Sequence, residues 1–208
     1  MTMINKESYN EFRNRIYSYL LDYKFKNITK QKGAFKFVES DYFLPDSIAS
    51  REFPAMMYKP ITPVVREIQN SEFKYKPHIF SYRHIASSQT ACINLFIPIL
   101  ESQHADDILK ELTATPSNFD HIDRDELFHG YRLEFWDSTD DKDKGLLGDH
   151  SKQAGTDSDI AIAYRDKQGN LCLWLIEHKL TEKEFTECGA YKSSKNETNH
   201  NCQECALS

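Results

Sequence analysis

The sequence contains no apolar run long enough for a transmembrane helix, which needs about 20 consecutive apolar residues. Its longest apolar stretches, such as "ACINLFIPIL", are much shorter than this. The first ten residues also lack the basic and then apolar segments of a secretory signal. Five cysteines, an odd number without such a signal, are typical of a reducing compartment rather than of a disulfide framework. We therefore expect a cytoplasmic protein with no membrane association.

The chain also lacks a surplus of basic residues, which is the usual sign of a nucleic-acid-binding surface. With 26 Lys and Arg against 32 Asp and Glu, its net charge is −6. This charge is unevenly distributed, because residues 1–80 are more basic than acidic and residues 101–150 are strongly acidic. An acidic total does not exclude an enzyme that attracts phosphate through bound metal ions. No P-loop, dinucleotide-binding fingerprint or Ser–His–Asp pattern is present either.

The composition is that of a soluble globular protein. Its 208 residues, 39% of them hydrophobic and 28% charged, suffice for one domain with a full core and are marginal for two. The spacing of apolar residues predicts a mixed α/β fold. We expect helices over residues 5–25, 62–71, 87–100 and 104–114, strands over 131–136, 159–164 and 171–180, and a long charged loop over 137–156.

Individual residues define the expected ends and faces of these helices. Thr62 is the expected N-cap of the second helix, with Pro63 at its first helical position. Ser87 or Ser88 caps the third. The first helix is expected to bury an apolar stripe formed by Tyr9, Phe12, Ile16, Tyr19, Leu20 and Tyr23.

The two strands of the segment "DIAIAYRDKQGNLCLWLIEHKL" have charged residues at their ends. Side chains alternate between the two faces of a strand, so Glu177 and Lys179 share the face of the leucines that precede them. We expect that face to be buried up to Glu177. A hairpin closing over Gly169 places the start of its first strand, Asp159, beside Glu177 and Lys179.

Two neighbouring carboxylates at a partly buried edge repel each other, and a cation relieves that repulsion. Mg²⁺ prefers oxygen ligands and is typically held by one or two carboxylates together with phosphate. A lysine nearby can orient a metal-bound water or counter the negative charge that develops during hydrolysis. The residues therefore fit a metal-assisted phosphodiester hydrolase. The alternative is an ordinary cluster of charged residues at the solvent-exposed ends of two strands.

The pattern "TDSDIAIAY…WLIEHK" resembles the PD-(D/E)xK nuclease superfamily, which has the restriction-endonuclease-like fold. The segments "ASSQTACINLFIPIL", "YRLEFW" and "IEHKLTE" are also similar to an uncharacterised bacterial branch of restriction-endonuclease-like proteins. The resemblance covers roughly residues 84–185. It implies an α/β core of a helix, three antiparallel strands, a further helix and a fourth strand. We expect one domain over 1–208, with a helical and aromatic extension (1–83), the catalytic core (84–185) and a polar tail (186–208).

The resemblance also implies the roles of the charged residues at the strand ends. Asp159 and Glu177 match the metal-binding carboxylates of the superfamily, and Lys179 matches its catalytic lysine. The backbone carbonyl of His178 would be a further metal ligand. Asp157 competes with Asp159 for the position of the aspartate, and we favour Asp159 because it directly precedes the apolar run.

Two further residues are implied by the same resemblance. Glu134 falls where many members keep an additional acidic residue that contributes to catalysis and metal binding, and Gln89 lies on the helix that often lines the site. The chain departs from the family pattern in having no proline before the aspartate and few residues after Lys179. The expected last helix and fourth strand are therefore incomplete, in a truncated form of a longer protein or in a homodimer whose partner supplies the strand.

A second metal site is one of two interpretations of the polar tail. Cys188, Cys202 and Cys205, with His200 between them, offer the thiolates and imidazole that tetrahedral Zn²⁺ prefers. The other interpretation is a tail with three unrelated thiols. Cys92 and Cys172 lie on apolar faces and are predicted core residues.

The sequence thus predicts an enzyme that hydrolyses phosphodiester bonds with Mg²⁺ or Mn²⁺, acting on DNA in preference to RNA. The resemblance alone suggests a role in defence against foreign DNA or in repair. A rival hypothesis is a catalytically idle restriction-endonuclease-like fold that binds nucleic acid or protein. A third is a structural zinc protein based on the tail cysteines.

Overall fold

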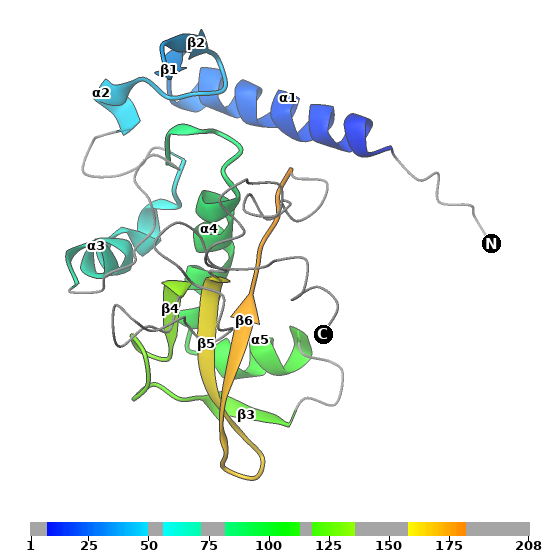
Figure 1. The fold of residues 1–208 in the computed structure, drawn as a ribbon, viewed down its shortest axis with the longest axis vertical. Coiled ribbons are helices and arrows are strands. Elements are labelled where there is room, and N and C mark those ends of the chain that lie inside the picture. The colour runs from blue at the N-terminus through cyan, green and yellow to red at the C-terminus, as the bar shows by residue number, and fades with distance from the viewer. Residues whose placement is uncertain (1–7, 50–55, 72–81, 113–117, 136–157, 182–208) are drawn as a thin grey trace, which may run out of the picture.

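The computed structural model describes residues 8–49, 56–71, 82–112, 118–135 and 158–181. This part of the chain is a mixed α/β structure with five α-helices, a two-stranded hairpin and a four-stranded antiparallel sheet (Figure 1). None of its helices is both long and apolar enough to cross a membrane. The elements are α1 (Tyr9–Asn27), β1 (Gly33–Phe35), β2 (Val38–Ser40), α2 (Asp46–Ala49), a 3₁₀ helix η1 (Lys59–Ile61), α3 (Thr62–Asn70), α4 (Ser88–Leu100), α5 (Ala105–Leu112), β3 (Phe119–Ile122), β4 (Tyr131–Phe135), β5 (Ser158–Asp166) and β6 (Leu171–Ile176).

Strand β5 is the centre of the larger sheet. β6 pairs antiparallel with one edge of β5 through the hairpin turn, and the other edge pairs with β4 and then with β3 further along. The four consecutive residues 160–163 of β5 are fully buried, as expected for a strand with neighbours on both edges. The predicted hairpin over the "DKQGN" turn is confirmed.

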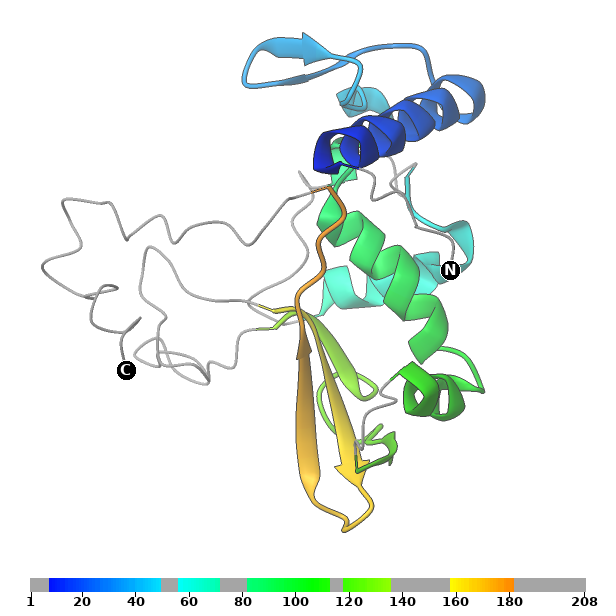
Figure 2. The ribbon, with the colours of Figure 1, turned by 90° about the vertical axis from the view of Figure 1, so that its right-hand side faces the viewer.

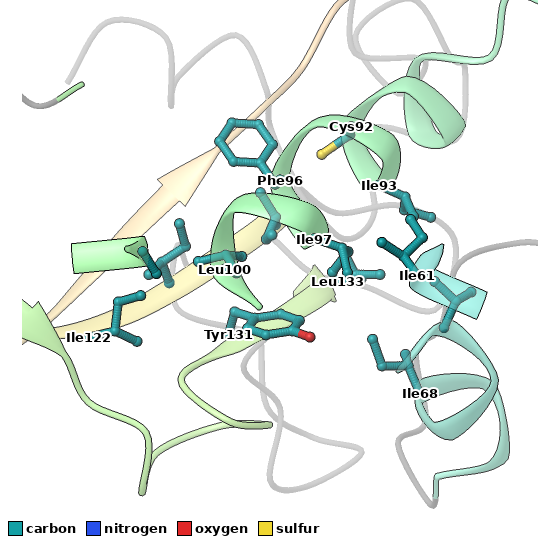
Figure 3. Packing of buried hydrophobic residues seen from close by; sticks show 14 of the residues in the cluster. Ile61, Ile68, Cys92, Ile93, Phe96, Ile97, Leu100, Ile122, Tyr131 and Leu133 are labelled. Atoms are coloured by element: carbon teal, nitrogen blue, oxygen red, sulfur yellow. The ribbon is translucent and has the colours of Figure 1, made fainter. Parts of the chain in front are cut away.

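Helix α4 covers one face of this sheet (Figure 2). It begins after Ser87, whose hydroxyl accepts a hydrogen bond from the Thr90 N–H, so the first of the two predicted caps is the one used. The helix is apolar around most of its circumference and supplies much of the core, as Figure 3 shows. The core joins α4 to η1, α3 and the sheet through Ile61, Ile68, Cys92, Ile93, Phe96, Ile97, Leu100, Ile122, Tyr131 and Leu133.

Two expected helix features are wrong. Thr62 is not the N-cap of α3, because η1 runs directly into this helix and Ile61 takes the cap position. The stripe expected on α1 is only partly buried, since Tyr19 is 67% and Tyr23 44% exposed. Leu20 does pack against the small cluster formed by Leu44 and Ile85.

The face assigned to the leucines of β6 is also wrong. Leu171 and Leu173 are 46% and 38% exposed, whereas Trp174 and Ile176, on the other face, pack against the core. Trp174 and Ile176 lie opposite Ile162 and Ile160 of β5, which face the same core. The regular strand also ends at Ile176, so Glu177 to Lys179 follow the strand instead of closing it.

A buried lysine attaches α1 to the segment that follows the β1–β2 hairpin. Lys24 is fully buried, and its Nζ donates hydrogen bonds to the carbonyl oxygens of Asp41 (2.7 Å) and Phe43 (2.9 Å). Burial lowers the pKa of Lys24, and the nearby charge of Asp41 opposes this shift.

We predict that Lys24→Met destabilises the protein by about 2–4 kcal/mol, because two partly buried hydrogen bonds from a charged donor are lost. The matched control is Lys26→Met, which removes the same charge from an exposed position in the same helical turn. Chemical denaturation of both variants measures the difference. Equal unfolding midpoints would show that the hydrogen bonds of Lys24 contribute nothing to stability.

Candidate active site

Asp159 and Glu177 lie at the same end of the β5–β6 hairpin. The last pair between the two strands is Ile160↔Ile176, and Asp159 and Glu177 are the next residues on either side of it. Asp159 also contacts His178, the residue after Glu177, through a hydrogen bond. The structure thus brings these two predicted residues together.

Glu134 lies on β4, on the other side of Asp159. The pairs that flank it are Leu133↔Ile160 and Phe135↔Ser158. Glu134 therefore sits across from Asp159, although its backbone has φ +50°, in the left-handed region that non-glycine residues rarely adopt. This conformation interrupts the pleat of β4, and the Glu134 side chain reaches α4, where its carboxylate accepts a hydrogen bond from Gln89 Nε2. Within the described part of the chain, the buried Oε1 of Gln89 has no hydrogen-bond partner.

Asp159 holds the chain in place just beyond the end of β6. Its Oδ2 accepts a hydrogen bond of 2.7 Å from the backbone N–H of His178. Burial raises the pKa of Asp159, the negative charge of Glu177 adds to the rise, and the His178 N–H and Lys179 oppose it. The ionised form of Asp159 is therefore short of compensating positive charge, and a bound cation would supply it.

Lys179 is positioned by its neighbour in the Glu-x-Lys motif. Its Nζ forms an ion pair with Glu177 Oε1, and the two side chains are 26% and 31% exposed. Lys179 and Glu177 therefore meet at the surface of the site, while Asp159 lies deeper.

Cys92 on α4 lies within electrostatic range of the three carboxylates. This thiol is 1% exposed, which confirms its predicted place in the core. Burial raises its pKa strongly, and the negative charges of Asp159, Glu134 and Glu177 each add to the rise. The negative charges of these carboxylates therefore reach the apolar core beside α4.

The donor set fits a hard divalent cation in its chemistry, since Mg²⁺ takes carboxylate oxygens and keeps several waters. The described residues contain no preformed group of three or more His, Cys, Asp or Glu side chains arranged around a metal. His178 contributes its N–H to Asp159, and the role of its carbonyl as a ligand stays a prediction. The alternative aspartate, Asp157, lies outside the described residues. So do Cys188, His200, Cys202 and Cys205 of the predicted zinc site, as well as the loop over 137–156.

Sequence reasoning missed the contribution of α1 to this region. The hydroxyl of Tyr9 donates a 2.7 Å hydrogen bond to the carbonyl of Thr181, two residues beyond Lys179. The helix therefore contacts the segment that carries the Glu-x-Lys motif. No local pattern indicates a contact between residues 172 positions apart.

Comparison with family models matches residues 20–206 to the family described as "Restriction Endonuclease associating with ARP". Comparisons with curated proteins and with solved structures found no match. The matched range includes Gln89, Glu134, Asp159, Glu177 and Lys179, and it covers most of the chain. The resemblance to restriction endonucleases is therefore confirmed, and the chain belongs to this restriction endonuclease family.

Proposed function

We propose that this protein is a Mg²⁺-dependent nuclease of the PD-(D/E)xK type that cleaves DNA. Family membership implies a nuclease and a DNA substrate. The observation that carries the catalytic assignment is the grouping of Glu134 on β4, Asp159 on β5 and Glu177 just after β6, with Lys179 paired to Glu177. In this proposal the catalytic core spans residues 84–185 of a single domain over 1–208. The expected helix and three antiparallel strands correspond to α4, β4, β5 and β6, and the structure adds α5 and β3 between α4 and β4.

Each residue has a distinct role in the proposed hydrolysis. Asp159 and Glu177 hold Mg²⁺ or Mn²⁺, with Glu134 as a further acidic group. The ion, when bound, supplies a Lewis acid that lowers the pKa of a coordinated water and neutralises phosphate charge. Gln89 orients Glu134 through its hydrogen bond. Lys179 stabilises the negative charge that develops on the phosphate as the water oxygen attacks phosphorus. The bond from phosphorus to one ester oxygen then breaks, leaving a phosphate monoester and a free hydroxyl.

Incubation with nucleic acids tests this proposal directly. Linear duplex, circular duplex, single-stranded DNA and RNA are each incubated with the protein in Mg²⁺, in Mn²⁺ and in EDTA. We expect cleavage of DNA with either metal, weaker or no cleavage of RNA, and none in EDTA. Nicked or linear products from the circle would identify an endonuclease. Intact DNA in all metal conditions would contradict the proposal.

A second candidate function is an idle fold that binds nucleic acid without cleaving it. It is favoured by the ion pair of Glu177, whose carboxylate already has a cationic partner in Lys179. Calorimetric titration with Mg²⁺ and Mn²⁺ separates the two functions. An active site with two adjacent carboxylates should release or take up heat on binding either ion, whereas the idle fold should show no saturable binding.

A further inference from the structure

A polar pocket of about 440 Å³ is lined by Gln89, the residue that donates a hydrogen bond to Glu134. Three segments that are far apart in the sequence form it: the first half of α1, the residues around the start of α4, and the chain that follows β6. Figure 2 shows these segments meeting where the end of the orange chain reaches α1 above α4. The lining residues that matter here are Tyr9, Arg13, Tyr17, His84, Gln89 and Thr181. Its volume lies within the range of about 300–1,000 Å³ that is usual for small-ligand pockets.

Two lining residues connect the pocket to the proposed active site. Gln89 lines the pocket and at the same time donates its hydrogen bond to Glu134. Thr181 lines it from the other side, two residues after Lys179, and accepts the hydrogen bond of Tyr9. A polymer bound at the carboxylates could therefore extend past Gln89 and Thr181 into this pocket.

The pocket carries a positive charge and aromatic rings, whereas the neighbouring carboxylates are negative. Arg13 is exposed, and its guanidinium lies 5.3 Å from the centre of the Tyr17 ring. Among the described residues it forms no ion pair, so its charge is available to an anion. Tyr17 also makes an edge-on contact with His84, with ring centres 5.9 Å apart. Arginine recognises phosphate through its planar fork of donors, and aromatic rings stack on unpaired bases.

We propose that this pocket binds a nucleotide of the substrate strand next to the cleaved phosphate. Arg13 contacts a backbone phosphate, and the aromatic wall of Tyr9 and Tyr17 holds the base. The proposal rests on the proposed nuclease function. It adds to it a preference for a strand whose bases are unpaired near the cut, because a base within a duplex cannot reach an aromatic wall.

Binding of a fluorescein-labelled oligothymidylate, measured by anisotropy, tests the pocket. The Lys179→Ala protein is used as the background so that the strand stays intact. We expect Arg13→Ala to weaken binding about tenfold, since a charge-assisted hydrogen bond to phosphate is lost. The slope of log affinity against log salt should also fall by about 0.7, the value for one phosphate contact with a single strand. Arg13→Gln, which keeps the length of the side chain, should give the same result.

Arg15→Ala is the matched control, because Arg15 lies on the same helix, is exposed and does not line the pocket. It should leave both the affinity and the salt slope near the parent values. Tyr17→Leu should weaken binding about fivefold without changing the salt slope, because it removes stacking and no charge. Circular dichroism melting of each variant shows whether the fold is retained.

The outcomes separate this proposal from the nuclease function. Equal losses in Arg13→Ala and Arg15→Ala would overturn the pocket, since the attraction would then be general to the helix. Equal affinity for the oligothymidylate and for a blunt duplex of the same length would overturn the unpaired-base preference. Cleavage by the parent protein is scored independently. If the parent protein cleaves DNA and Arg13→Ala binds as tightly as the parent, the pocket proposal is contradicted and the nuclease function stands. If binding depends on Arg13 but the parent protein does not cleave, the nuclease function is contradicted and the pocket is supported.

Discussion

Lys179→Ala is expected to abolish DNA cleavage and to leave the fold intact. The ammonium lies beyond the end of β6, beside the Glu177 carboxylate, and its side chain is about a quarter exposed. In the proposed function its charge faces the phosphate, and its position after the end of β6 keeps it out of the strand pairing. Removing one preorganised electrostatic group from an active site typically costs about 10²–10³-fold in kcat. The free energy of unfolding should change by less than about 1 kcal/mol, as is usual for exposed ion pairs.

Two further variants sharpen this test. Lys179→Arg should also fail, because guanidinium is planar, larger and effectively never deprotonated, so it does not replace a compact ammonium near a metal-bound water. Lys167→Ala is the control, since Lys167 is exposed in the turn at the other end of the same hairpin. Single-turnover cleavage assays measure all three. A rate near the parent's in Lys179→Ala would reduce Lys179 to a counter-charge for Glu177, and the surface-cluster interpretation would then hold.

Local patterns were sufficient to predict strand β4, the β5–β6 hairpin and the charged residues at its open end. β5 and β6 are joined by a short turn, so their register follows from the turn, and that register brings Asp159 and Glu177 to the same end of the hairpin. The helix α4 was predicted for a similar reason, because Ser87 caps a long apolar segment. Both features depend on residues close together in the sequence.

The sequence of β6 does not determine which of its two faces is buried. Both faces are apolar, so alternation alone does not say which one packs inward. The face of Trp174 and Ile176 is buried because it joins the core beneath α4, and Leu171 and Leu173 are left exposed. The short strands β1, β2 and β3 were missed because three or four residues are too few for a periodic pattern.

Other parts of the site depend on contacts between distant segments. Gln89 and Glu134 are 45 residues apart. The left-handed backbone that brings Glu134 to α4 occurs at a glutamate, so no glycine in the sequence indicates it. Arg13 lies on a helix whose apolar stripe suggested only core packing. The resemblance to a nuclease family named Gln89 and Glu134, whereas no sequence feature indicated the pocket on α1.

Asp159→Asn is expected to remove metal binding together with activity, which distinguishes Asp159 from Lys179. Asparagine has nearly the same size, and its carbonyl oxygen still accepts the hydrogen bond from the His178 N–H. What is lost is the negative charge that faces the cation. Since even indirect perturbation of a metal site costs about 10–100-fold in affinity, loss of a ligand charge should cost at least that much. Titration calorimetry with Mg²⁺ and Mn²⁺ measures it, and Lys179→Ala should still bind the ion.

Asp159→Asn is expected to lose activity without losing stability. Burial raises the pKa of Asp159 in the folded protein, so its ionised form at neutral pH opposes folding. Replacing it by a neutral amide should therefore leave the melting temperature unchanged or raise it. Asp125→Asn, which removes the same charge from an exposed loop, is the control and should change neither property. A loss of function with a gain in stability is typical of a residue kept for its chemistry. Unchanged cation affinity in Asp159→Asn would instead place Asp159 among the ordinary hydrogen-bonding residues of the strand end.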